Sequence, residues 1–114
     1  MSNDLAHVLD MLKSAEAITR FVDGTSEQTF LTDLEKQSAV MYQFAVLGES
    51  ANRVSKAFEA SHPEIAWGDV VGFRNVLIHQ YHSVDLAIVW ETVTNRLPAL
   101  IAQLRLIAPA NPNA

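Results

Sequence analysis

The segment Arg74–Tyr81 places a cation, an imidazole and a phenol close together, with the spacing Arg-x4-His-x-Tyr. A guanidinium such as that of Arg74 can donate two parallel hydrogen bonds to a phosphate. An imidazole such as that of His79 can take or give a proton near neutral pH, as general acid–base catalysis requires. These residue types make Arg74 and His79 candidates for chemistry at a phosphate.

Simpler interpretations of the same residues stay open. A histidine near a helix end commonly binds the last carbonyl groups of that helix, and an arginine on an apolar face commonly forms an intramolecular ion pair. A metal site is another interpretation, because His79, His82 and Asp85 have tolerable ligand spacing. With no cysteine and no third histidine nearby, the metal site is the weaker alternative, and we expect neither a metal nor a cofactor.

Helix geometry divides the segment between two surfaces. At about 100° per residue, Gly72, Asn75 and His79 share one narrow face, whereas Arg74 and Tyr81 fall on the apolar side. Arg74 and His79 are separated by about 7.5 Å of rise and about 140° of rotation, so one helix does not bring both onto one small atom. A two-fold dimer that packs these helices together would place two of each residue in one cleft. Alternatively, the two residues could flank a groove within one chain, especially if the helix unwinds near His79. Of these two arrangements, we expect a site assembled across a dimer interface, with Tyr81 at its rim.

Arg74 needs a hydrogen-bond acceptor, because an unpaired guanidinium on an apolar face costs several kcal/mol. The candidates are Glu49 or Asp69 of the same chain, a carboxylate of a second subunit, or a bound phosphate. Glu49 lies away from the apolar stripe of its own helix, so it is either a solvated charge or the residue that orients Arg74. Asn75, on the face of His79, is expected to orient the phosphate or the imidazole.

The elements that must position these residues are helices. Apolar side chains recur at intervals of three and four along most of the chain, which predicts amphipathic helices. The predicted segments are residues 4–22, 26–31, 34–60, 67–81 and 84–107, of which the second is one short turn. Pro98 should kink or interrupt the last of them. The expected fold is all-α, an up-and-down helical bundle of four main helices plus a short extra helix.

Helix ends and one glycine carry more specific predictions. Gly24 is expected to end the first helix in a left-handed conformation, and Thr32 or Asp33 to cap the next long helix. Ser83 is expected to cap the last helix, with an aspartate in its first turn. Gly48 lies in the middle of a helix, where glycine costs about 1 kcal/mol relative to alanine. Close approach of another helix is the usual compensation.

Length, composition and charge bound the function. With 114 residues, 49% of them apolar and 18% charged, the chain is expected to form one domain over residues 1–114, with residues 108–114 as a frayed tail. The absence of cysteine excludes disulfides and thiolate metal sites and fits the cytoplasm. No signal peptide or run of transmembrane length is found, so no membrane association is expected. The formal net charge of −5 opposes non-specific nucleic-acid binding, so RNA could bind only through a small local site.

One stretch carries a family resemblance. The sequence WGDVVGFRNVLIHQY of Trp67–Tyr81, followed by Val84-Asp85 and Val89-Trp90, resembles the HepT toxins of the HEPN superfamily of small helical bundles. The similarity extends upstream to Gly48-Glu49 and to residues 61–67, and downstream to residues 97–100. It therefore covers most of the chain, in order, and the Arg-x4-His-x-Tyr pattern is intact.

The resemblance implies a metal-independent endoribonuclease that acts as a homodimer. Arg74 and His79 would form the active site in a cleft between protomers. His79 would deprotonate a ribose 2′-hydroxyl or protonate the leaving 5′-oxygen, and Arg74 would hold the scissile phosphate and stabilise its growing charge. Internal attack would leave a 2′,3′-cyclic phosphate.

The resemblance also implies a partner. In HEPN/MNT toxin–antitoxin pairs, the residue that corresponds to Tyr81 is modified with AMP by a nucleotidyltransferase antitoxin of the MntA type. An added phosphate and adenine would fill or repel the RNA site. The alternative function is a non-catalytic HEPN module that serves as an accessory subunit to a nucleotidyltransferase or binds a nucleotide. A plain dimeric scaffold is a further alternative, against which the apolar position of Arg74 argues.

Overall fold

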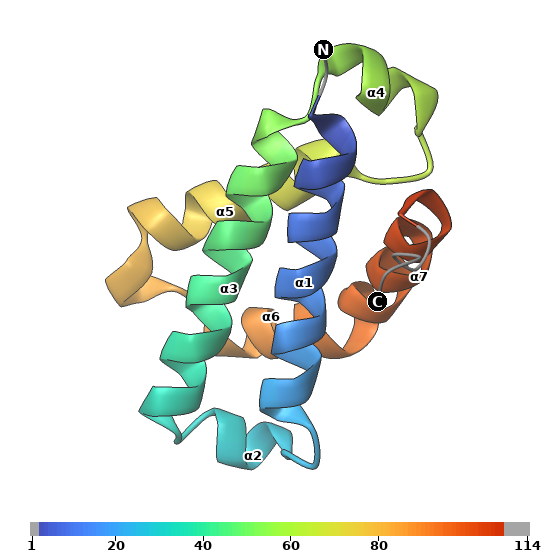
Figure 1. Cartoon of the computed structure of the whole chain (residues 1–114). Helices are drawn as coiled ribbons and strands as arrows, with labels where there is room; N and C mark the ends of the chain where they lie inside the picture. Colours follow the sequence, from blue (N-terminus) through green and yellow to red (C-terminus); the bar gives the residue numbers. More distant parts are fainter. Residues whose placement is uncertain (1–2, 109–114) are drawn as a thin grey trace.

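Four long helices pack around one apolar core in the computed structural model, which describes residues 3–108 of the chain. In Figure 1, α1 and α3 lie side by side. Helix α7 packs beside α1, and α5 packs beside α3. The described residues contain no β-strand, so the all-α bundle prediction is confirmed. The helices are α1 (Asp4–Val22), α2 (Glu27–Phe30), α3 (Leu34–Arg53), α4 (Lys56–Ser61), α5 (Trp67–His79), α6 (Leu86–Glu91) and α7 (Leu97–Ile107), with a 3-10 turn at Tyr81–Ser83 and a π-helical turn at Thr92–Arg96.

The core is built from the apolar stripes that the sequence predicts. Each large aliphatic or aromatic side chain that is fully buried contributes about 1.5–3 kcal/mol relative to its exposed state. Within residues 3–108, no helix combines the length and the apolar character needed to cross a lipid bilayer. The central buried side chains are Val8, Met11, Ile18, Phe30, Val40, Phe44, Leu47, Leu77, Val89 and Leu104.

Two predicted helix ends are confirmed. Gly24 follows α1 with a φ of 72°, the left-handed conformation that glycine adopts without a steric penalty. Asp33 caps α3, because its Oδ1 accepts a hydrogen bond from the Lys36 amide at 2.9 Å. These two ends define the turn that carries the chain from α1 through α2 into α3.

The second long helix is shorter than predicted. It ends at Arg53, and a separate helix, α4, begins at Lys56 with Ser55 as its cap. Asp4 in the first turn of α1 accepts hydrogen bonds from both the amide and the hydroxyl of Ser55, each at 2.8 Å. The prediction of one helix to residue 60 is therefore wrong, because a side chain distant in sequence stabilises the break.

The last predicted helix is divided as well. Asp85, rather than Ser83, caps α6, and its Oδ1 accepts from the Ala87 amide at 2.9 Å; Ser83 is instead part of the 3-10 turn. A π-helical turn separates α6 from α7, where Pro98 occupies the first turn and needs no amide donor. The predicted interruption at Pro98 is confirmed. Of the predicted tail, residues 109–114 lie outside the described part of the chain.

Candidate active site

Gly48 marks the place where α3 and α5 come into contact. A Cβ atom added at Gly48 would overlap the Cβ of Arg74, and it would lie 2.7 Å from the Arg74 Cγ and 3.3 Å from the Val70 carbonyl oxygen. Glycine therefore permits an approach of the two helices that a larger residue would prevent. The predicted close approach at Gly48 is confirmed, and the residue on the other side of the contact is Arg74.

The guanidinium of Arg74 extends from this contact to two neighbouring side chains. Its Nη2 donates to Oε2 of Glu49 at 3.1 Å, and its Nη1 donates to Oδ1 of Asn75 at 2.8 Å. Its Nε is buried and has no hydrogen-bond partner among the described residues. Each terminal nitrogen of an arginine carries two N–H groups, so Nη1 and Nη2 each keep one donor for a ligand. The side chain is 27% exposed, so solvent reaches part of it.

Glu49 connects Arg74 with a second arginine. While its Oε2 accepts from Arg74, its Oε1 accepts from Nε of Arg53 at 3.3 Å. Asp69, the other candidate within the chain, forms no ion pair in residues 3–108. Of the two interpretations of Glu49, the contact supports the one in which its carboxylate orients Arg74.

Asn75 contacts Arg74 rather than His79. Its amide oxygen accepts from the guanidinium, although the helical wheel places Asn75 and His79 on one face. Residues i and i+1 diverge around a helix, but the long arginine side chain can fold back to its neighbour. Glu49, Arg74 and Asn75 thus form one hydrogen-bonded group, in which two acceptors fix the plane of a single cation.

His79 lies at the end of α5 and is exposed. Its ring makes no hydrogen bond within the described chain, so the interpretation of His79 as a cap for the last carbonyl groups is not supported. The backbone amide of Gln80 closes the helix instead, donating to the Val76 carbonyl at 2.9 Å. His79 is therefore an imidazole that is held by the backbone of α5 and open to a ligand.

Tyr81 is placed by a turn and not by the helix. Because α5 ends at His79, the predicted position of Tyr81 on the apolar face of the helix is wrong. The tyrosine begins a 3-10 turn, and its ring meets the His82 ring edge-on at a centroid distance of 5.7 Å. Its side chain is about half exposed, so its hydroxyl lies near His79 in sequence and is accessible.

A hollow of about 500 Å³ lies between α1, α3 and α5, and Arg74 forms part of its wall. Arg53 and His7 are two lining residues that the sequence analysis did not select. The spacing of four between Glu49 and Arg53 is a helical ion-pair signal, whereas nothing in the sequence places His7 of α1 opposite them. We call this the α1–α3–α5 hollow; its lining is His7, Asp10, Ala45, Val46, Glu49, Ser50, Arg53, Arg74 and Ile78.

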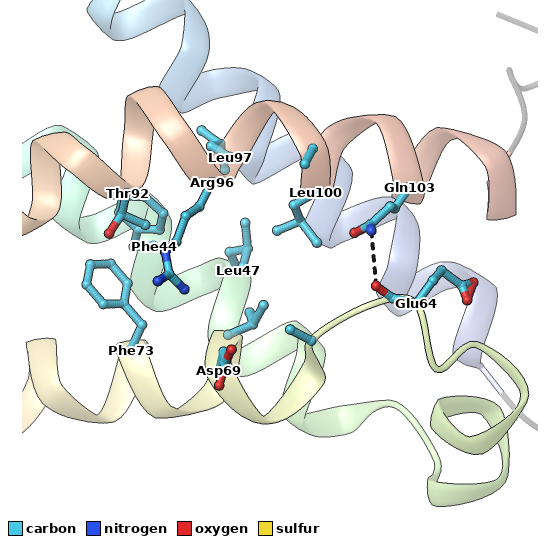
Figure 2. A pocket seen from close by; sticks show the side chains of 13 residues that line it. Phe44, Leu47, Glu64, Asp69, Phe73, Thr92, Arg96, Leu97, Leu100 and Gln103 are labelled. Carbon is cyan, nitrogen blue, oxygen red and sulfur yellow. Dashed lines mark hydrogen bonds between the residues drawn. The ribbon is translucent and has the colours of Figure 1, made fainter.

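A second pocket, of about 230 Å³, lies between α3, α5 and α7. Its walls are mainly apolar, and Figure 2 shows the Arg96 side chain extending into it from the π-helical turn. Gln103 Nε2 donates to the Glu64 carbonyl at 3.0 Å at the other end. None of the predicted site residues lines this pocket, so it is separate from the Arg74 group.

The metal interpretation finds no support in the arrangement of the side chains. Among residues 3–108, no group of three histidine, aspartate or glutamate side chains comes together in a way that could hold an ion. His82 lies against Tyr81, and Asp85 is occupied as the cap of α6. His79, His82 and Asp85 therefore do not form the ligand set that their spacing suggested.

Comparisons with known proteins place this chain among ribonuclease sequences. The family model described as "Ribonuclease HepT-like" matches residues 11–107. A Thermococcus cleftensis protein named "Probable ribonuclease HepT" is 33% identical over 80% of this chain and 83% of its own length. A Caldanaerobacter subterraneus subsp. tengcongensis protein named "Putative RNase" is 30% identical over 85% of this chain and 87% of its own. The comparison with solved structures gives no match.

Proposed function

The chain belongs to the HepT-like ribonuclease family, and we propose that it is a metal-independent endoribonuclease that cleaves RNA by attack of a ribose 2′-hydroxyl. The observation that carries the proposal is the hydrogen bonding of the Arg74 guanidinium. Glu49 and Asn75 fix the plane of its guanidinium, while one N–H on each terminal nitrogen stays available to a phosphate. The intact spacing to an exposed His79 at the end of the same helix adds a proton-transfer group.

In the proposed reaction, His79 accepts the proton of the 2′-hydroxyl as O2′ forms a bond to phosphorus. The bond between phosphorus and the 5′-oxygen breaks, and that oxygen leaves with a proton from a second acid. The products are a 2′,3′-cyclic phosphate and a 5′-hydroxyl. Arg74 binds the non-bridging oxygens and stabilises the charge that grows on them in the transition state.

A homodimer would supply the second acid. Within one chain, helix geometry separates Arg74 and His79 by about 140° around α5, so a second copy is needed to complete the cleft. The face of α5 that carries Gly72 and His79 is open, and a Cβ added at Gly72 would meet no atom of residues 3–108 within 4 Å. Val76 on the same face is 43% exposed. We propose that a second copy packs its own α5 against this face.

We also propose that this protein is a toxin and that a nucleotidyltransferase antitoxin of the MntA type silences it. The Tyr81 phenol oxygen would attack the α-phosphorus of ATP, releasing pyrophosphate and leaving AMP on the tyrosine. Tyr81 is exposed enough to be reached by an enzyme, and it lies two residues beyond His79. The added phosphate would repel RNA from the cleft, and the adenosine would obstruct it.

A non-catalytic module that accompanies a nucleotidyltransferase, or that binds a nucleotide, is the second candidate. The observation in its favour is the formal net charge of −5, which disfavours RNA as a ligand. The proposed ribonuclease would cleave RNA, whereas the non-catalytic module would leave RNA intact.

The test is incubation of single-stranded RNA with purified protein in excess EDTA, followed by analysis of the new ends. We expect 2′,3′-cyclic phosphate and 5′-hydroxyl ends, and no cleavage of a 2′-O-methyl RNA of the same sequence. Loss of cleavage in EDTA with recovery on adding Mg²⁺, or 5′-phosphate products, would overturn the mechanism. No cleavage under any condition would favour the non-catalytic module.

A further inference from the structure

The α1–α3–α5 hollow has the size and mixed lining of a ligand site. Its volume of about 500 Å³ falls within the range of about 300–1,000 Å³ that is usual for small-molecule and cofactor sites. Ala45, Val46 and Ile78 give it an apolar part, against which the flat face of a base or a ribose can pack. Polar and charged groups line the rest, and one of them is Arg74, the residue that binds phosphate in the proposed reaction.

Arg53 is the second cation of the hollow, and its present partner holds it weakly. Its Nε lies 3.3 Å from Glu49, and 63% of its side chain is exposed. Exposed ion pairs at this helical spacing contribute little to stability. Glu49 is also shared with Arg74, so one carboxylate neutralises only one of the two positive charges. A phosphate can therefore replace Glu49 on Arg53 at little energetic cost.

The facing charges limit what this hollow can bind. Asp10 and His7 belong to α1 and line the hollow opposite Arg53, which belongs to α3. When His7 is neutral, the formal charges of the two arginines of the lining balance those of its two carboxylates. A polyanion bound along the whole hollow would meet Asp10. A single nucleotide avoids it, because its phosphate can sit on the arginine side while a base amine donates to the Asp10 carboxylate.

We propose that the α1–α3–α5 hollow binds the nucleotide next to the scissile phosphate of a single-stranded RNA. In this arrangement Arg53 contacts the phosphate of that nucleotide, and its sugar and base pack on Ala45, Val46 and Ile78. The inference rests on the proposed ribonuclease function and extends it, because it adds Arg53 and the α1 wall to the substrate-binding surface.

The test measures the affinity of the protein for a 2′-O-methyl RNA oligonucleotide, which has no 2′-hydroxyl nucleophile, at several salt concentrations. Arg53→Gln is expected to weaken binding and to reduce the slope of log K against log salt by about 0.7, the value for one phosphate contact on a single strand. Arg20→Gln is the matched control. Arg20 is exposed in the last turn of α1 and does not line the hollow. It lies about 20 Å along the helix from His7, and its loss should leave the slope unchanged.

A second variant tests the packing of the nucleotide rather than its charge. Ala45→Leu adds bulk to the wall of the hollow, and it is expected to weaken binding without changing the salt slope; thermal unfolding confirms that the variant is folded. Wild-type slope and affinity in both variants would overturn the subsite, and weaker binding in Arg53→Gln alone would overturn the nucleotide-packing part. Failure of the wild-type protein to bind or cut any RNA would instead overturn the proposed function itself.

Discussion

The Glu49 carboxylate lies 3.1 Å from Nη2 of Arg74 and thereby joins α3 to the helix that carries the candidate catalytic residues. The pair is partly exposed, with side chains 42% and 27% accessible, so its contribution to stability is expected to be below about 1 kcal/mol. Its importance lies in orientation, because a guanidinium that donates to fixed acceptors presents its other N–H groups in a fixed direction.

The first prediction therefore concerns Glu49 as a positioning residue. Glu49→Ala should lower kcat by about 10- to 100-fold, since small misplacements of a catalytic group have effects of this size, while thermal stability changes little. Glu49→Gln should recover much of the loss, because its amide oxygen still accepts from Arg74. The measurement is kcat and KM for RNA cleavage by the three proteins. A change in KM alone, or equal loss in both variants, would contradict the positioning role.

The second prediction concerns the proposed catalytic pair, Arg74 and His79. His79→Ala should reduce cleavage by about 10²- to 10⁴-fold, the usual contribution of general acid–base catalysis. Arg74→Ala should reduce it as well, because the phosphate loses its cation. His82→Ala is the matched control, since His82 is an exposed histidine three residues beyond. The assay is single-turnover cleavage with circular dichroism as a check on folding; cleavage at the wild-type rate by His79→Ala would rule out the proposed mechanism.

The third prediction uses the contact at Gly48. Gly48→Ala should destabilise the fold by about 1–3 kcal/mol, because the new methyl group overlaps the Arg74 side chain. Gly72→Ala should instead stabilise the monomer by about 0.5–1 kcal/mol through helix propensity, because the added Cβ meets no atom of the described residues within 4 Å. Urea unfolding at low protein concentration measures both. Equal shifts of the two variants would show that α3 and α5 do not approach as closely as described.

The fourth prediction concerns the proposed dimer. Gly72→Leu should convert the protein to a monomer and abolish cleavage while the chain stays folded, because the added side chain projects from the open face of α5. Ala102→Leu provides the control, since Ala102 is an exposed position of α7. Sedimentation analysis measures the assembly state. A monomeric wild-type protein that cuts RNA, or a Gly72→Leu dimer, would remove the argument for a shared site.

The fifth prediction concerns modification. Incubation with a nucleotidyltransferase of the MntA type and ATP should add AMP to the chain, as measured by intact mass. Tyr81→Phe should remain unmodified, whereas Tyr42→Phe should be modified like the wild type. Tyr42 is the better exposed of the two tyrosines, at 66% against 48%, so this comparison separates specific recognition from simple accessibility. Modification of Tyr81→Phe would assign the target to another residue.

The sequence predicted the features that depend on local chemistry. The apolar period defined the long helices, Gly24 and Asp33 marked two of their ends, and Gly48 indicated the close contact of α3 with another helix. These predictions succeed because each depends on a single residue type and its near neighbours. The partner of Arg74 was among the candidates named, since few carboxylates were available to it.

The features that sequence reasoning missed depend on residues that are distant in the chain. Val54 and Phe58 continue the apolar period of α3, so the break at Ser55 becomes visible only with Asp4 of α1 in contact. The inclusion of His7 in the hollow likewise requires α1 to lie beside α3. The position of Tyr81 does not follow from helical geometry, because α5 ends at His79.

The two hydrogen bonds between Asp4 and Ser55 have a consequence for the order in which the molecule is made. Both residues, and the whole of α1 and α3, are synthesised before Arg74 and His79. Since domains fold from the N-terminus as the chain emerges, we expect the α1–α3 hairpin to form while α5 is still inside the ribosome. Glu49 would then be in place before Arg74 emerges, and the nascent chain would lack the proposed nuclease site until α5 docks at Gly48. Amide-exchange protection of α1 and α3 in chains that are stalled with α5 still inside the ribosome would reveal this order.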